Sequence, residues 1–157
     1  MTGRRLWLFP AIFAVHVVEE GLAGEGFGRW IRRLSGREVG TATFFAVNAA
    51  FEGAMVAAVH RATRRDGAAW VAPALGLIGA ANGLGHLAGS VATRSYSPGA
   101  VSGAGLWAPL GLVALRRSRR ALPRRDWRRG VALGAAVSVG VMPLALAVSH
   151  RPDQSPQ

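Results

Sequence analysis

Five long stretches of this chain contain no arginine and consist almost entirely of apolar and small residues. They cover residues 6–24, 39–60, 68–92, 99–115 and 130–149, which makes each of them 17 to 25 residues long. A bilayer core about 30 Å thick is crossed by about 20 helical residues. The sequence therefore predicts an all-α transmembrane helical bundle of about five spans, forming one domain over residues 1–150 and followed by a disordered tail at residues 151–157.

The charged residues lie mainly between these stretches, with 19 basic residues against 8 acidic ones. Thirteen of the arginines fall in the N-terminal segment, the 61–65 loop and the 116–129 loop, and six fall in the remaining segments. Short segments rich in arginine resist translocation, so we expect a multi-pass protein of the cell membrane with a cytoplasmic N-terminus. We expect the loop from Arg116 to Arg129 to contact anionic lipid and to have no nucleic-acid role.

A small set of polar side chains lies inside the first three predicted spans, where a carboxylate is costly and rarely kept without a function. They are His16, Glu19 and Glu20 in the first span, Asn48 and Glu52 in the second, and Asn82 and His86 in the third. At about 100° per residue, the three residues of the first span share one helical face. Each of the other two pairs is spaced four residues apart and therefore forms a single stripe.

The rise per residue also predicts the depth of these side chains. Measured from the outer ends of the predicted spans, Glu20 and His86 lie about 6 to 9 Å deep, whereas Glu52 lies about 20 Å deep. We expect the stripes to meet in the outer half of the bundle, with Glu52 as the deepest member. Three carboxylates would then converge without an arginine in any span to neutralise them.

Three sources of positive charge can neutralise such a cluster: bound protons, protonated His16 and His86, or one or two divalent cations. Imidazole and carboxylate groups at helical spacing form a metal-ligand set, and the absence of cysteine excludes a zinc–thiolate site and an iron–sulfur cluster. The predicted ligands of a zinc or iron ion are His16, Glu19, Glu20, Glu52 and His86, with Asn48 and Asn82 as weak ligands or groups that orient the ligands.

This site fits three kinds of function. The first is a metal-dependent membrane enzyme that acts on a lipid or another apolar substrate, in which Glu19 or Glu20, whichever does not bind the metal, handles protons. The second is a proton- or cation-coupled transporter that uses the same carboxylates. The third is a structural membrane protein in which a buried polar network only pairs the helices.

The run from His16 to Glu20 reads His-Val-Val-Glu-Glu and resembles the name-giving motif of the HXXEE family of small multi-span bacterial membrane proteins. Three further segments resemble other motif blocks of that family in the same order: residues 48–52, residues 81–86, and the run Tyr-Ser-Pro-Gly at residues 96–99. Ser102 departs from the pattern, which has threonine at this place. The family is uncharacterised, so the resemblance supports the site without naming its chemistry.

Two further patterns concern packing. Apolar residues at helical spacing in the first loop, Phe27, Trp30, Ile31 and Leu34, predict a short interfacial helix that is either a connector or a cover over the outer mouth of the site. Glycines spaced four apart, at 79 and 83 and at 85 and 89, predict that the third span is the packing centre. We expect it to hold Asn82 and His86 against the first two helices.

Overall fold

The structure is a computed structural model that describes residues 3–37, 39–64 and 68–148, with side chains of the last helix described to Gly140. Within these ranges the chain forms helices and no strands, as predicted. The elements are α1 (Gly3–Leu6), α2 (Leu8–Leu22), α3 (Phe27–Ser35), α4 (Thr41–Arg64), α5 (Val71–Thr93), α6 (Ala100–Ser102), the π-helix η1 (Gly103–Trp107), α7 (Ala108–Ala121) and α8 (Arg124–Val148). The predicted tail at 151–157 lies outside the described residues.

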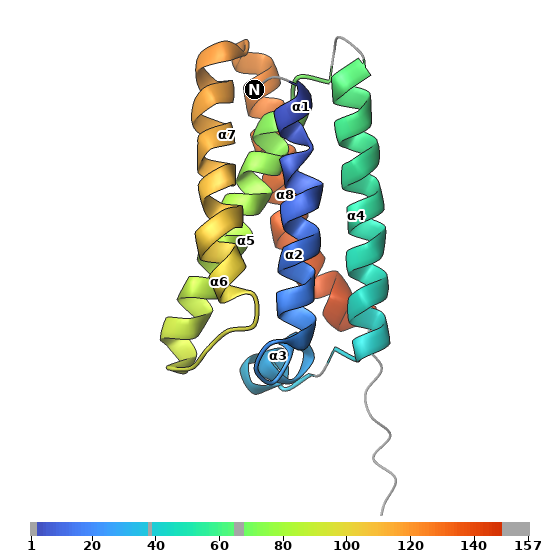
Figure 1. The fold of residues 1–157 in the computed structure, drawn as a ribbon, viewed down its shortest axis with the longest axis vertical. Coiled ribbons are helices and arrows are strands. Elements are labelled where there is room, and N and C mark those ends of the chain that lie inside the picture. Colours follow the sequence, from blue (N-terminus) through green and yellow to red (C-terminus); the bar gives the residue numbers. More distant parts are fainter. Residues whose placement is uncertain (1–2, 38, 65–67, 149–157) are drawn as a thin grey trace, which may run out of the picture.

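The long helices run side by side along one axis, and the short helix α3 lies across one end of the bundle (Figure 1). Helix α5 packs against α7, α8 and η1, while α2 packs mainly against α4 and η1. Two apolar cores result. One gathers Phe9, Phe13, Val59 and Trp107 between α2, α4 and η1, and the other lies beneath α3.

Fewer helices are long and apolar enough to cross a membrane than the five predicted. In the described part of the chain α4 and α5 qualify, and the bent pair Gly3–Leu22 and Phe27–Ser35, whose parts meet at 71°, gives a third if it is one span. Helix α2 has only 15 residues because it ends before a turn at residues 23–26. The fourth stretch is divided by the π-helix. The fifth predicted span, residues 130–149, extends beyond Gly140, the last residue of α8 whose side chain is described.

Glycines allow the backbones around α5 to approach closely. A Cβ atom added to Gly83 would collide with the carbonyl oxygen of Gly103, and one added to Gly111 would lie 2.5 Å from the carbonyl oxygen of Gly76. Small residues at such crossings replace side-chain contact with backbone contact. Helix α5 is therefore the packing centre, as predicted, but its close partners are η1, α7 and α8 rather than the first two helices.

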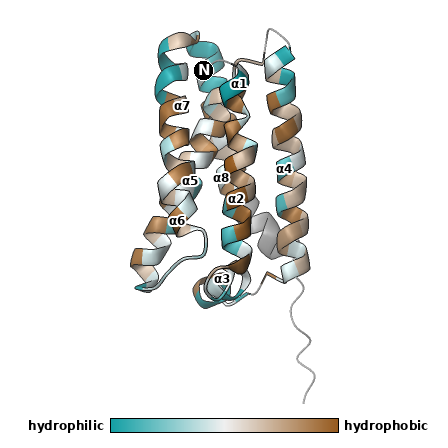
Figure 2. Ribbon diagram, viewed as in Figure 1, coloured by the Kyte–Doolittle hydropathy of each residue, from teal (hydrophilic) through white to brown (hydrophobic). Residues whose placement is uncertain are grey.

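Hydrophilic residues gather at the end of the bundle that holds the start of α1, the end of α7 and the start of α8 (Figure 2). Two arginines at this end lie over indole rings. The guanidinium of Arg119 is 5.2 Å from the ring centre of Trp127, and that of Arg129 is 5.5 Å from the ring centre of Trp70. The first of these cation–π contacts joins α7 to α8, and the second joins α8 to the start of α5.

Candidate metal centre

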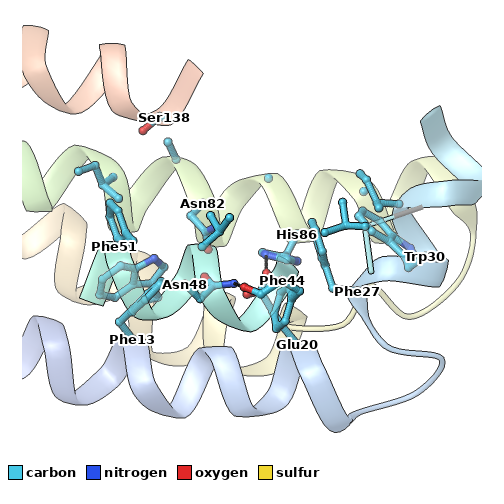
Figure 3. A pocket seen from close by; sticks show the side chains of 18 of the residues that line it. Phe13, Glu20, Phe27, Trp30, Phe44, Asn48, Phe51, Asn82, His86 and Ser138 are labelled. Carbon is cyan, nitrogen blue, oxygen red and sulfur yellow. Dashed lines mark hydrogen bonds and ion pairs between the residues drawn. The ribbon is translucent and has the colours of Figure 1, made fainter. Parts of the chain in front are cut away.

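Three ionisable side chains meet in the bundle: His16 and Glu20 from α2 and His86 from α5. The Nε2 atom of His86 lies 3.0 Å from Glu20 Oε1, and Nε2 of His16 lies 3.7 Å from the same oxygen. One ligand atom from each residue lies within 4.8 Å of the other two. All three residues are at least 95% buried. Figure 3 shows Glu20 and His86 next to each other among the residues that line a pocket, between Phe13 and Phe51 on one side and Phe27 and Trp30 on the other.

Helical spacing explains the contribution of α2. His16 and Glu20 are four residues apart, so their side chains lie one above the other on one face of the helix. His86 reaches the same place from α5, and its ring centre is 5.0 Å from that of His16. The spacing on one helix and the packing of the second helix together define the cluster.

Each imidazole has a serine hydroxyl within hydrogen-bond distance of its Nδ1 atom. Nδ1 of His16 lies 2.9 Å from Ser102 Oγ, and Nδ1 of His86 lies 3.0 Å from Ser97 Oγ. The partner of one ring nitrogen fixes the ring orientation and the role of the other nitrogen. Both Nε2 atoms therefore face Glu20, and among the described residues Nε2 of His16 has no hydrogen-bond partner.

Indole rings form much of the wall around the two imidazoles. Trp107 stacks on His16 with 6.4 Å between the ring centres and 21° between the planes, and Trp30 stacks on His86 at 6.4 Å and 29°. Trp107, which lies in the middle of the fourth apolar stretch, is completely buried. The cluster is thus surrounded by aromatic rings rather than by charged groups.

The segment between α5 and η1 lies directly against the cluster. Gly99 has a φ of +90°, and a Cβ atom there would lie 2.7 Å from Glu20 Cγ and 2.8 Å from His16 Cε1. Glycine is required for both the backbone angle and the close approach. The same segment supplies Ser97 and Ser102, so residues 97–102 support the whole cluster. The sequence marked this region only through its resemblance to a motif block, and Ser102 keeps the hydroxyl group that the expected threonine would have.

Glu19 does not join the cluster. Its carboxylate accepts hydrogen bonds from the backbone N–H groups of Val101, at 2.9 Å, and Ser102, at 2.6 Å, and from the Tyr96 hydroxyl. Burial, together with the hydrogen bond to Glu19, raises the pKa of Tyr96 to about 12. Glu19 therefore fastens the 96–102 segment to α2, and backbone amides satisfy a carboxylate for which the sequence offered no partner.

Glu52 also lies apart from the His16, Glu20 and His86 group. Its Oε2 atom is buried without a hydrogen-bond partner in the described part of the chain. Asn48 donates a hydrogen bond to the carbonyl of Phe44 at 2.9 Å, and Asn48 and Asn82 line the pocket beside Glu20 and His86. The structure thus brings together three of the five predicted ligands, and the predicted convergence of three carboxylates is wrong.

Helix α3 forms at the predicted place, and its apolar residues Phe27, Trp30 and Ile31 are buried. They line the pocket next to His86, so α3 covers this end of the site. Arg33 reaches from α3 to the carboxylate of Glu25 and to Ser95 Oγ, the latter at 3.0 Å. This contact joins the cover to the segment that follows α5.

The sequence profile of a family described as "Protein of unknown function with HXXEE motif" matches residues 7–114. This range contains the whole cluster and both supporting serines. No curated protein and no solved structure matches the chain.

Proposed function

The chain belongs to the HXXEE family, whose function is unknown, and from this premise and the geometry of the cluster we propose a metal-dependent enzyme of the membrane. In this proposal His16, Glu20 and His86 hold one divalent zinc or iron ion. The substrate is a lipid or another apolar molecule that enters the adjacent pocket. The observation that carries the proposal is the pair of buried imidazole nitrogens facing one buried carboxylate.

The donor set fits a transition metal. Two histidines and one glutamate form the protein ligands of catalytic zinc sites and of the non-haem iron triad, and both kinds of site leave a coordination position open. A metal-binding histidine usually donates its second ring N–H to an oxygen atom, and Ser97 and Ser102 are placed to accept such bonds. The Nε2 atom of His16 is buried, and its polar neighbours include the Glu20 carboxylate, at 3.7 Å, and the Asn82 side chain.

A bound ion of this kind would activate water or oxygen. The chain's own contribution is to keep the ligands fixed and the surroundings dry, because aromatic rings pack on both imidazoles. Glu19 was a candidate for proton transfer. Its hydrogen bonds to two amides and to Tyr96 instead favour a role in holding the 96–102 segment.

One observation favours a second candidate. The 3.0 Å contact between His86 Nε2 and Glu20 Oε1 has the length of an ordinary hydrogen bond, so the cluster can also exist as a metal-free polar network. A network of this kind would serve a proton-coupled transporter, or would only pair α2 with α5. The metal content of the protein separates these alternatives from the enzyme.

The membrane location is supported by two helices that are long and apolar enough to cross a bilayer. Large apolar side chains on α5, including Leu84, Leu87 and Val91, are exposed, as expected of a surface that faces lipid. The arginine-rich end would then lie on the cytoplasmic side, where the 116–129 loop meets anionic headgroups.

The experiment measures bound metal by elemental mass spectrometry in protein purified without chelator. We expect about one zinc or iron ion per chain in the wild type, and its loss in His16→Ala, His86→Ala and Glu20→Gln. His60→Ala is the matched control, because His60 is exposed on α4 at the opposite end of the bundle. Glu52→Gln should also retain the metal, which separates the three-residue site from the five-residue site. Wild-type protein without stoichiometric metal would refute the proposal.

A further inference from the structure

The pocket beside the cluster is long and narrow. Its volume is about 400 Å³, and residues of α5 line it from Ile78 to Gly89. This wall is about 16 Å long at the helical rise of about 1.5 Å per residue. At about 30 Å³ per non-hydrogen atom, the volume of a water molecule in the liquid, the pocket holds about thirteen atoms. An extended chain of about thirteen atoms is about 15 Å long, at about 1.25 Å per C–C bond, so the pocket is about one chain wide.

The end of the pocket at Ile78 is closed by the larger apolar core. Phe13 and Trp107 line the pocket and belong to this core, and Phe51 and Ile78 line the pocket and pack against the core. The ring of Phe13 contacts both other rings, with its centre 5.1 Å from that of Phe51 and 5.6 Å from that of Trp107. A chain that lies in the pocket therefore ends at these packed side chains.

Glu20 and His86, the two members of the cluster that line the pocket, lie closer to its other end. Figure 3 shows both side chains between the aromatic rings at the closed end and those of α3. Trp30 of α3 stacks on His86, so α3 covers the cluster directly. Along α5, His86 is eight residues, about 12 Å, from Ile78 and three residues, about 4.5 Å, from Gly89. The cluster thus divides the pocket into a long arm towards Ile78 and a short arm beneath α3.

The lining of the long arm suits hydrocarbon. Besides the side chains at its closed end, Ala81 and Val137 contribute apolar surface. Three polar side chains also line the pocket, and each already has a partner within the protein: Asn48 donates to the carbonyl of Phe44, Ser138 donates to the carbonyl of Gly134, and Asn82 interacts with His16. Binding in this arm therefore depends on burial of apolar surface.

We infer that the long arm measures the length of an unbranched hydrocarbon chain from the metal site. The substrate class is an acyl or alkyl compound whose reacting group lies at the cluster. The long arm takes about ten carbon atoms at about 1.25 Å per bond, and the short arm takes a group of about three or four atoms. The inference rests on the proposed function, because the bound ion is the point from which the chain is measured.

The test uses straight-chain hydroxamic acids of six to fourteen carbon atoms. A hydroxamate chelates zinc or iron at open coordination positions, so it anchors the chain at the cluster. Binding to the protein in lipid nanodiscs is measured by calorimetry, with empty nanodiscs as the reference for partitioning. We expect the affinity to rise about fourfold per methylene up to about ten carbons and then to stop rising. The compact adamantane-1-carbohydroxamic acid should bind at least about tenfold more weakly than decanohydroxamic acid, because it overpacks a space one chain wide.

Two variants of α5 locate the chain. Ala81 lines the long arm five residues, about 7.5 Å, from His86, so Ala81→Leu should shorten the preferred chain to about six carbons. Ala88→Leu is the matched control, because Ala88 is exposed on the same helix and lies outside the pocket. Ile78→Ala removes part of the closed end and should lengthen the preferred chain by about two carbons. Comparison of one probe between variants cancels its partitioning into the bilayer.

Three outcomes would overturn the inference: affinity that rises steadily to fourteen carbons, equal binding of the adamantane compound and the straight chain, or a preferred length that neither variant changes. Ile78→Ala keeps the test decisive if Ala81→Leu does not fold, because the two substitutions act on the preferred length in opposite directions.

Metal content and the binding of straight-chain alcohols, measured in the same samples, keep the two proposals separate. Protein without metal in which the alcohols reach a limit near about thirteen carbons, the length of the whole pocket, would refute the metal-dependent enzyme and leave a pocket for a single chain in place. Stoichiometric metal without a limit on chain length would refute the substrate class and leave the metal site in place. Absence of both would refute both proposals.

Discussion

Helices α4 and α5 have nearly the same length and mean hydropathy, but they differ in how much of each helix is buried inside the molecule. They have 24 and 23 residues and mean hydropathies of 1.5 and 1.3 in their most apolar stretches. In α4, 17% of the most apolar stretch is buried inside the molecule, whereas in α5 the buried share is 56%. Glycine content accounts for the difference, because close backbone contact with η1 and α7 requires Gly76, Gly79 and Gly83 on α5.

The candidate site draws on both helices for different purposes. His86 is fixed on the tightly packed α5, and both supporting serines follow in the next segment of the chain. Helix α4 supplies pocket wall, including Phe44 and Asn48, but no member of the cluster. His86 and the two serines therefore lie on or next to the tightly packed α5, whereas His16 and Glu20 lie on α2, which packs mainly against α4.

The largest expected effect comes from glycines on the two faces of α5. Gly83→Ala places a methyl group against the carbonyl oxygen of Gly103, and overpacking against backbone should lower the free energy of unfolding by about 3 kcal/mol. Gly85→Ala, two residues later, meets open space and should raise it by about 0.5 to 1 kcal/mol through helix propensity. Denaturation of both variants in mixed micelles measures the difference, and equal effects would contradict the packing asymmetry.

An intermediate effect is expected at Gly99, in the segment that follows α5 and lies against the cluster. Gly99→Ala combines an unfavourable φ of +90° with contacts to Glu20 and His16, so it should destabilise the fold by about 2 kcal/mol and weaken metal binding at least about tenfold. Gly36→Ala is the control, because Gly36 also has a positive φ, +71°, but no neighbouring atom within 4 Å. It should cost about 1 kcal/mol and leave metal affinity unchanged. A titration with zinc detects whether the two variants differ.

The smallest effect tests the contact between Glu19 and the 96–102 segment. Tyr96 is the single tyrosine of the chain, so its ionisation can be followed directly by ultraviolet absorbance. Its pKa is raised from 10.0 to about 12, so the stability it contributes is present below pH 10 and is lost as the pH rises through about 12. In Glu19→Gln the midpoint should move back towards 10. An unchanged midpoint in that variant would show that Glu19 does not hold the tyrosine.

Helical spacing was enough to predict the core of the candidate site. His16 and Glu20 at i and i+4, and His86 at a similar depth on another helix, do meet. The same depth estimate already placed Glu52 more than 10 Å deeper than Glu20, and the structure keeps Glu52 apart. The error lay in assuming that every carboxylate of the apolar stretches must share one site.

The remaining features depend on the local backbone conformation, which the pattern of apolar residues does not reveal. Glu19 lies on a helical face close to that of His16, but its partners are the backbone amides of Val101 and Ser102. Because nearly every residue type has a backbone N–H group, the sequence does not identify such partners. The π-helix at residues 103–107, which divides the fourth stretch, likewise has no signature in hydropathy. The arginine-free stretches therefore predict helices better than they predict how many of them cross a membrane.

The two imidazoles share one scaffold, since Ser97 and Ser102 stand five residues apart on the same short connection and Gly99 lies between them. A change that lengthens or tilts this connection would therefore be transmitted to both rings. Improvement of such a centre, in the laboratory or by natural variation, should proceed by exchange of the whole connection together with residues 16–20 rather than one substitution at a time.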